Sequence, residues 1–273
     1  MKSGSPWVAT GGVVQGATHI RQDKICQDAL FIHPVQGKDF ALACVADGHG
    51  SDRCPYSDEG AAAAVKIAAD ILAELLESDD PKNMLAAQKD IRLPRLIEAI
   101  WKETVQTAYE RKAEAQPPEE NGEIPPFSYE LYGTTLLALV AAPGFVFALQ
   151  IGDGDIVAID PDGSARYVLP PCDHPGNETE SLCMEDSWKY VRTQLIPIDS
   201  TQPAPHMLLL STDGYANSFV DSAGFLKAGA DIYRLWRENG RAYIEENLPG
   251  WLSQTSADGS GDDISVAIIA QSE

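Results

Sequence analysis

Aspartate stands beside glycine at the ends of four apolar, strand-like runs of this chain. The four junctions are Asp47-Gly48, Asp153-Gly154, Asp213-Gly214 and Gly261-Asp262-Asp263. A short carboxylate at the end of a buried strand is a rigid ligand for a hard cation, and the adjacent glycine allows close approach. Because Asp-Gly is also a common turn dipeptide, one junction alone would indicate only a turn. Four junctions together predict a metal site that holds more than one ion.

Strands must carry these aspartates, and the apolar pattern predicts where the strands run. They are expected at 7–10 with 13–14, 29–32, 40–46, 131–142, 145–151, 207–210 and 264–269. Helices are expected at about 60–76, 92–112, 222–238 and 241–253. Turns are expected at 143–144 and 161–163, a Pro/Glu-rich loop at 116–126, and an irregular insertion at about 170–190. This order predicts a strand-rich core flanked by helix pairs rather than an alternating βαβ sheet.

The bulk composition excludes several classes of protein. With 41 acidic and 20 basic residues the formal net charge is −21, which argues against nucleic acid and against an anionic membrane as partners. Forty-four per cent hydrophobic residues is enough for a sizeable core. The five cysteines include no CxxC pair, and neither a secretory signal nor a membrane-spanning run is seen. We therefore expect a reduced, cytoplasmic setting.

An ordered set of short motifs runs from about Gly16 to Ile269. The motifs are DGHG at 47–50, GTT at 133–135, GDG at 152–154, STDG at 211–214 and GDDISV at 261–266. In this order and spacing the chain resembles the metal-dependent type 2C protein serine/threonine phosphatases. His19 and the run Gln27-Asp28-Ala29 look like a divergent bacterial branch of that family. The resemblance implies an α+β fold, a four-layer αββα sandwich of two antiparallel β-sheets flanked by helix pairs, formed by a single domain over residues 1–273.

The resemblance also implies two Mn²⁺ or Mg²⁺ ions that share a bridging water. Asp47 would bridge both ions, the Gly48 carbonyl would add an oxygen, and Asp213 and Asp262 would complete the first ion's ligands. Asp28 is the remaining candidate ligand of the second ion, and Asp153 is a candidate ligand of a third, weakly held ion. Oxygen ligands of this kind suit both metals. Two cations would lower the pKa of the shared water to give a hydroxide that attacks phosphorus, while His49 protonates the leaving oxygen.

Several positions depart from the family pattern. Where the family's phosphate-binding arginine is expected, this chain has Asp23, so Arg21 and Lys24 are candidate substitutes as phosphate ligands. Gln27 replaces a usual carboxylate, and Asn217 stands where many members have a further aspartate. Four histidines have no partner that the sequence suggests and are expected to be structural: His19, His33, His174 and His206. The GTT motif is expected to pack a strand against neighbouring backbone.

The leading hypothesis is a protein phosphatase that hydrolyses phosphoserine and phosphothreonine. Its partners would be a phosphoprotein substrate and, by the resemblance, a cognate serine/threonine kinase. The missing arginine and Gln27 motivate an alternative, a catalytically weak or inactive relative that binds a phosphoprotein or a regulatory partner. A metal-dependent hydrolase of small phosphorylated metabolites is a third hypothesis. The insertion at 170–190 is expected to shape access to the site or to be a surface excursion.

Overall fold

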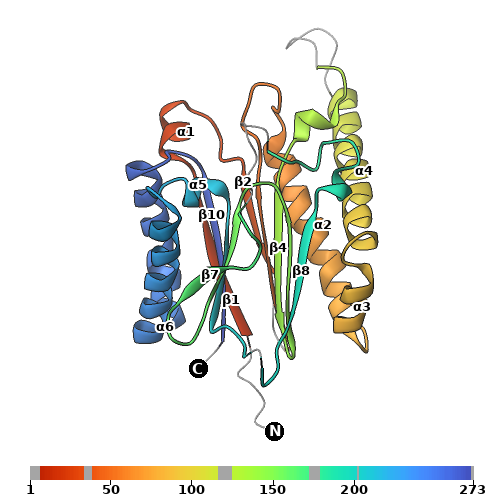
Figure 1. The fold of residues 1–273 in the computed structure, drawn as a ribbon. Coiled ribbons are helices and arrows are strands. Elements are labelled where there is room, and N and C mark those ends of the chain that lie inside the picture. Colours follow the sequence, from red (N-terminus) through yellow and green to blue (C-terminus); the bar gives the residue numbers. More distant parts are fainter. Residues whose placement is uncertain (1–6, 34–38, 116–124, 172–178, 202, 272–273) are drawn as a thin grey trace.

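The described part of the chain, residues 7–33, 39–115, 125–171, 179–201 and 203–271 of a computed structural model, contains two five-stranded antiparallel sheets. Figure 1 shows the sheets face to face with helices outside each. The first sheet has the order β1 (Trp7–Val14), β10 (Ile264–Gln271), β9 (Met207–Ser211), β6 (Asp155–Ile159) and β7 (Ala165–Tyr167). The second has the order β2 (Asp28–Ile32), β3 (Ala41–Asp47), β4 (Leu136–Ala142), β5 (Phe145–Ile151) and β8 (Arg192–Pro197).

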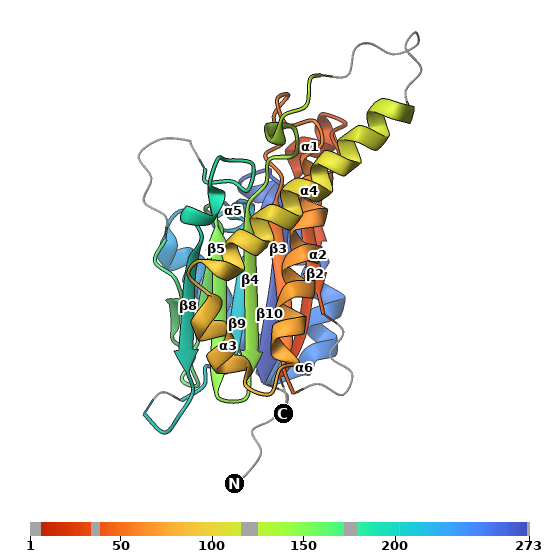
Figure 2. The same cartoon turned by 90° about the vertical axis from the view of Figure 1, so that its right-hand side faces the viewer.

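Helices cover the outer face of each sheet. The second sheet is covered by α2 (Ser57–Leu76), α3 (Pro81–Gln88) and α4 (Arg92–Ala115), as Figure 2 shows. The first sheet is covered by α6 (Ser222–Asp258). Short helical turns lie in the connections: α1 (Ala17–Arg21), η1 (Tyr129–Tyr132), η2 (Ser187–Lys189) and α5 (Asp213–Ala216). The predicted αββα sandwich is confirmed.

Three separate apolar clusters fill the spaces between the four layers. Successive side chains of β3 belong alternately to two of these clusters. Ala41, Ala43 and Val45 pack between the sheets, whereas Leu42 and Cys44 pack against the helices. Successive side chains of a strand point to opposite faces, so a central strand of such a sandwich must be apolar on both. This explains the continuous apolar run that precedes Asp47.

The predicted break between two C-terminal helices lies at Gly240. Its φ of 80° and ψ of 176° interrupt α6, so this element consists of two helical segments. Glycine adopts a positive φ without the steric cost that a Cβ imposes. The predicted hairpin turn at 143–144 is also confirmed, because Ala142 and Phe145 pair directly and Gly144 has a φ of 84°.

The expected strand at 131–142 is shorter in the structure. Its first residues form η1, and β4 begins only at Leu136. The intervening GTT motif is extended but hydrogen-bonds to the end of β3 instead of continuing a ladder, with one isolated bridge between Gly48 and Thr134. The short elements α1, α3, α5 and β6 to β8 were not predicted. The described part of the 170–190 insertion is irregular apart from η2, as expected.

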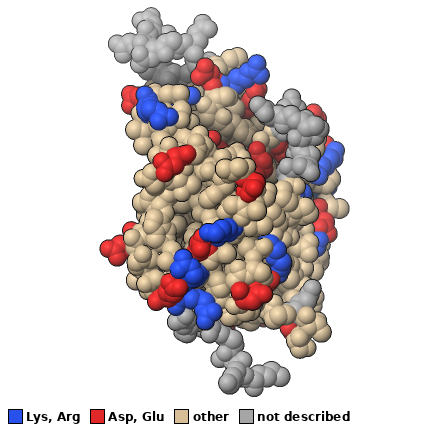
Figure 3. All heavy atoms as spheres, turned by 60° about the vertical axis from the view of Figure 1, so that its left-hand side comes forward, with Lys and Arg blue, Asp and Glu red and all other residues tan. Residues whose placement is uncertain are grey.

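Both signs of charge occur on the surface despite the large negative net charge. On the face drawn in Figure 3, lysine and arginine side chains lie beside aspartate and glutamate side chains. Most ion pairs on α6 join residues three or four positions apart, as exposed helices commonly do. Within the described ranges, every helix is too short or too polar to cross a membrane.

Candidate metal and phosphate site

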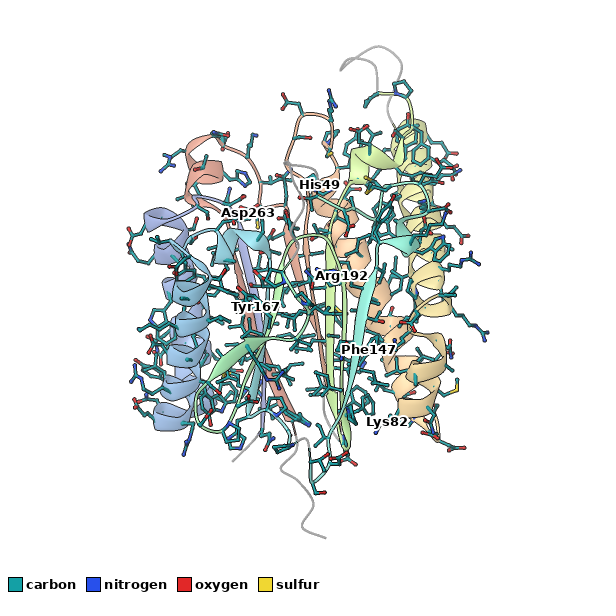
Figure 4. The ribbon with its side chains drawn as sticks, in the orientation of Figure 1. His49, Lys82, Phe147, Tyr167, Arg192 and Asp263 are labelled. Carbon is teal, nitrogen blue, oxygen red and sulfur yellow. The ribbon has the colours of Figure 1, made fainter. Side chains whose placement is uncertain are left out.

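The strand ends that carry the predicted aspartates meet at one end of the sandwich, where Figure 4 shows His49 and Asp263. There they border a cavity of about 970 Å³. Of the six predicted metal ligands, five line it: Asp47, Gly48, Asp153, Asp213 and Asp262. Asp28 is not among its described lining residues. Residues far apart in sequence are thereby brought to one place, because antiparallel strands from both sheets begin or end at this edge.

Backbone contacts from the GTT motif hold Asp47 in place. The Thr134 hydroxyl donates to the Asp47 carbonyl (2.8 Å), and the Thr135 amide donates to the same oxygen (2.9 Å). In return the Asp47 amide donates to the Thr135 hydroxyl (2.9 Å). The main chain of Asp47 is therefore fixed on both sides, which leaves its carboxylate free to face the cavity. The motif was expected to pack against neighbouring backbone, and this is what it does.

Asp28, Asp47 and Asp213 form a cluster of carboxyl groups. Asp28 and Asp47 stand opposite each other in the register of β2 and β3. The Asp213 carboxylate is one of the negative neighbours that raise the pKa of Asp47. Burial, followed by repulsion from the neighbouring carboxylates, raises the pKa of all three groups above the ordinary value for aspartate. A cation placed among them would remove that penalty.

Hydrogen bonds satisfy only part of this cluster. The Thr212 hydroxyl donates to Asp28 Oδ2 (2.7 Å), and the side-chain Nδ2 of Asn217 donates to Asp213 Oδ2 (2.9 Å). Asp213 Oδ1 is buried and has no hydrogen-bond partner among the described residues. A buried acceptor without a donor is costly, so it points to a ligand that the protein itself does not supply.

The two adjacent aspartates at 262 and 263 have different surroundings. The Asp262 side chain is 50% exposed, whereas that of Asp263 is 3% exposed. Asp263 accepts the amides of Gly16 (2.6 Å) and Gln27 (2.7 Å), and so fixes both ends of the segment before β2. Asp262 remains open to the cavity. The side chains of consecutive residues in an extended segment point to opposite sides. Asp262 is therefore the candidate metal ligand, and Asp263 holds the segment before β2.

His19, for which the sequence suggested no partner, contacts both of these aspartates. Its Nδ1 lies 2.9 Å from Asp263 Oδ1, and its Nε2 lies 3.8 Å from Asp262 Oδ1. His19 also borders the cavity. Sequence reasoning missed the contacts of both His19 and Asp263, although the Asp262-Asp263 pair was visible in the GDDISV motif.

His49 lies in the loop after β3 and borders the cavity. Its amide donates to the Gly133 carbonyl (3.1 Å), and a Cβ at Gly133 would lie only 2.6 Å from the His49 ring. Burial lowers the pKa of the His49 imidazole, and the nearby Asp153 carboxylate partly opposes this. The backbone of His49 is thus fixed, its ring packs closely against Gly133, and the Asp153 carboxylate is nearby.

Residues of the predicted insertion form one wall of the cavity. Thr179 donates its hydroxyl to Asp153 Oδ2 (2.6 Å). Ser181 is anchored to Thr134 through two hydrogen bonds, from the Thr134 amide (3.1 Å) and to the Thr134 carbonyl (3.0 Å). Cys183 and Met184 also border the cavity. The described part of the insertion therefore borders the cavity, and its expected control of access stays a prediction.

The basic residues proposed as phosphate ligands lie elsewhere on the segment before β2. Arg21 is exposed and donates to the Thr18 hydroxyl (2.9 Å), and Lys24 is exposed as well. Neither side chain is among the described residues that border the cavity, where Arg53 is found instead. Gln27, which replaces a carboxylate, is buried and donates to the Ser57 hydroxyl (3.1 Å). It braces the start of α2 rather than facing the cavity.

The donor chemistry at the cavity fits Mg²⁺ or Mn²⁺. Carboxylate and carbonyl oxygens predominate, and these ions keep several waters, so few protein ligands need to be in place beforehand. Within the described ranges, three or more aspartate, glutamate, histidine or cysteine side chains are nowhere already gathered in metal-ligand geometry. The buried Asp213 Oδ1 without a partner and the raised pKa values of its neighbours nevertheless favour occupation by cations.

A model of the family described as protein phosphatase 2C matches residues 15–253. No curated protein gives a significant sequence match. The fold is similar to that of PppA from Pseudomonas aeruginosa, described as a key regulatory component of the T6SS, with a TM-score of 0.62. The two chains are 16% identical, and 98% of each is covered.

Two further solved structures are similar over almost their whole length. The serine/threonine phosphatase PstP/Ppp of Mycobacterium tuberculosis has a TM-score of 0.61 and 16% identity, with 98% of this chain and 99% of that chain covered. The serine/threonine phosphatase Stp1 from Staphylococcus aureus has a TM-score of 0.61 and 18% identity, with 100% and 98% covered. At these identities the likeness establishes the fold.

Proposed function

The chain belongs to the protein phosphatase 2C family, and we propose that it is a metal-dependent phosphatase that hydrolyses phosphoserine and phosphothreonine in proteins. The observation that carries this proposal is the set of buried carboxyl groups around Asp47 and Asp213, with an unpartnered oxygen on Asp213. Such a cluster is unfavourable unless cations bind to it.

Two Mn²⁺ or Mg²⁺ ions would be held by this cluster. Asp47, the Gly48 carbonyl, Asp213 and Asp262 would serve the first ion, and Asp28 with Asp47 the second. Asp153, fixed by Thr179, is the candidate for a third and weaker ion. When bound, such ions lower the pKa of a shared water and neutralise charge on the phosphoryl oxygens.

The other residues of the cavity act on the substrate. His49 is held at its backbone by Gly133 and faces the same cavity as the carboxylates. It would donate a proton to the serine or threonine oxygen as the bond to phosphorus breaks. His19 would keep Asp262 in position through its contacts with Asp262 and Asp263.

Membership of the family and the composition support a proposal about the wider setting. We propose a phosphoprotein substrate, a cognate serine/threonine kinase that opposes this activity, a bacterial origin and a cytoplasmic location. We also propose that residues 1–273 form a single domain. The large negative net charge argues against nucleic acid as a partner, because it would repel the phosphate backbone.

Phosphatase assays test the proposal directly. The purified chain is expected to hydrolyse a phosphothreonine peptide with Mn²⁺ and to stop when a chelator is added. Asp213→Ala is expected to lower kcat/KM by about a thousandfold or more, because charge stabilisation by metal is the main demand of phosphoryl transfer. Its free energy of unfolding without metal should be unchanged or higher at pH 7, since a buried charge with an unpartnered oxygen is removed.

A surface variant provides the control. Asp231→Ala on α6 removes a carboxylate that contacts Lys227 and Arg234 on the same helix, and it should leave turnover unchanged. A folded chain that binds Mn²⁺ calorimetrically yet turns over neither a peptide nor para-nitrophenyl phosphate would contradict the proposal. That result would favour the inactive, phosphoprotein-binding relative instead.

A further inference from the structure

Among the described residues that border the cavity, Arg53 is the only lysine or arginine. It lies in the loop between β3 and α2, a few positions after Asp47 and His49. Its side chain is exposed, and its guanidinium forms no hydrogen bond or ion pair with any described residue. A positively charged side chain that faces a cavity of carboxylates without pairing to one of them is available for a ligand.

The backbone around Arg53 is well fixed, although its side chain is not. The Cys54 amide donates to the Ser51 carbonyl (2.9 Å), which closes a turn around Arg53. Cys54 itself is 4% exposed and anchors the turn in the protein. Two residues later, the Tyr56 amide donates to the Leu131 carbonyl (2.9 Å). The main chain of Arg53 is therefore held at a defined place beside the cavity, and its side chain is free to turn toward a ligand there.

The other basic residues near this end of the molecule either have partners or lie outside the described lining of the cavity. Lys102 lies 2.6 Å from Glu98 and also donates to the Met184 carbonyl (3.0 Å). Lys112 lies 2.6 Å from Glu59 and stands over the Tyr56 ring. The Arg21 guanidinium donates to Thr18 and lies outside the described lining of the cavity. Lys24 is exposed and also lies outside that lining.

The charge of the site explains why such a residue is needed. Asp47, Asp153, Asp213 and Asp262 all border the cavity, and two divalent ions would do little more than neutralise them. A phosphate monoester brings further negative charge. Arginine is suited to hold it, because its planar guanidinium donates two parallel hydrogen bonds to phosphate oxygens.

We propose that Arg53 binds the phosphate group of the substrate. This inference rests on the proposed phosphatase function, since it names the residue that holds the substrate of that same site. Arg53 takes the place of the arginine that the family resemblance led us to expect before β2. It reaches the phosphate from the loop that carries His49 and directly follows Asp47, so metal, acid and phosphate contacts come from one short stretch of the chain.

Binding of inorganic phosphate to the Mn²⁺-loaded chain tests this without any turnover. Calorimetry is expected to give a dissociation constant for phosphate that is at least tenfold larger for Arg53→Ala than for the unaltered chain. Arg53→Lys should recover part of the loss, because charge is kept while the paired hydrogen bonds are lost. The affinity for Mn²⁺ should be the same in all three proteins. Arg241→Ala on α6, which removes an exposed arginine paired with Glu245, should bind phosphate normally.

Steady-state kinetics add a second measurement. Arg53→Ala should raise KM at least tenfold for both a phosphothreonine peptide and para-nitrophenyl phosphate, since the phosphate is common to both. A rise for the peptide alone would overturn the inference in favour of contact with the peptide chain. Loss of phosphate binding in Arg21→Ala or Lys24→Ala, with none in Arg53→Ala, would also overturn it.

Failure of the proposed function gives a different pattern. If the unaltered chain shows no turnover but binds phosphate through Arg53, the phosphatase proposal fails while the assignment of Arg53 holds. If the Mn²⁺-loaded chain binds no phosphate at all, the assignment of Arg53 is wrong.

Discussion

His49 has surroundings that work against the role proposed for it. Burial disfavours the imidazolium and lowers the pKa of the ring, while the Asp153 carboxylate favours the charged form. At pH 7 the free site therefore holds His49 mainly in its neutral form. A phosphate dianion that enters the cavity would shift this balance toward the charged form by direct attraction. Proton donation would then depend on the arrival of substrate.

Replacement of His49 separates substrates by their leaving groups. His49→Gln is expected to lower kcat for a phosphothreonine peptide by about a hundredfold, within the usual range for loss of a general acid. The rate for para-nitrophenyl phosphate should fall far less, because nitrophenolate leaves without protonation. Rates with both substrates at saturating Mn²⁺ measure the difference. Equal losses for the two substrates would show that His49 acts otherwise than as an acid.

Local sequence was enough to find the residues at strand ends but not those fixed by distant contacts. Asp47 and Asp213 come at the ends of continuous apolar strands, so their positions at strand ends could be predicted. The role of Asp263 depends on the Gly16 amide, which is 247 positions away in the chain. Arg53 lies in a loop whose course is set by the Ser51–Cys54 turn and by Leu131, which sequence reasoning did not foresee.

At the scale of elements, the long periodic segments were predictable and the short ones were not. The apolar pattern placed α2, α4 and the central strands β3, β5, β9 and β10 within a few residues. β7 has only three residues and β8 is only half buried, so neither has a strong apolar alternation. η1 replaces the start of an expected strand because Tyr132 packs tightly against Gly60 of α2. Such packing is a tertiary effect that overrides local propensity.

Two helical glycines make opposite predictions. A Cβ at Gly60 would lie 1.9 Å from the Tyr132 carbonyl oxygen, so α2 would have to move away from η1. Gly60→Ala should therefore lower the free energy of unfolding by about 2 kcal/mol, as overpacking commonly does. Gly250 is exposed on α6, and a Cβ added there would have none of the described atoms outside its own helix turn within 4 Å. Gly250→Ala should therefore raise the free energy of unfolding by about 0.5–1 kcal/mol. Urea unfolding of the two variants measures both changes.

The position of Gly60 also couples this packing to the site. Tyr132 leads directly into the GTT motif, whose Thr134 and Thr135 hold Asp47. Gly60→Ala should thus also weaken Mn²⁺ binding, while Gly250→Ala should leave it unchanged. If the free energy of unfolding rose in both Gly60→Ala and Gly250→Ala, the close contact at Gly60 would relax without cost.

At the scale of the whole molecule, much of the acidic excess is spread over the surface, but part of it is concentrated at one end of the sandwich. There burial and repulsion raise the pKa of Asp28, Asp47 and Asp213. A carboxyl group with a raised pKa in the folded state holds its proton where the unfolded chain has lost it. Stability without metal must therefore fall as the pH rises through that interval. Bound Mn²⁺ should reverse the loss, because it binds only the folded cluster.

Asp155 allows this linkage to be measured at a residue outside the proposed metal ligands. Burial, with repulsion from Asp153 and Asp213 and partial compensation by Arg192, raises the pKa of Asp155 to about 6. In the unfolded chain the pKa is about 3.9, so the folded state binds more protons between these values and loses stability as the pH rises. Asp155→Asn cannot titrate. The free energy of unfolding of Asp155→Asn, relative to that of the unaltered chain, should therefore be higher at pH 8 than at pH 5 by on the order of 1 kcal/mol.

Urea unfolding in the presence of a chelator at pH 5 and pH 8 measures this gain, and Asp162→Asn is its matched control. Asp162 is fully exposed, and hydrogen bonds from Ser164 lower its pKa. A lowered pKa stabilises the folded state above the ordinary pKa and loses this effect only below it. Asp162→Asn should therefore differ from the unaltered chain by the same amount at pH 5 and pH 8. If Asp155→Asn also gave a constant difference, Asp155 would be ionised throughout, and the carboxylate repulsion at this end of the sandwich would be weaker than the geometry indicates.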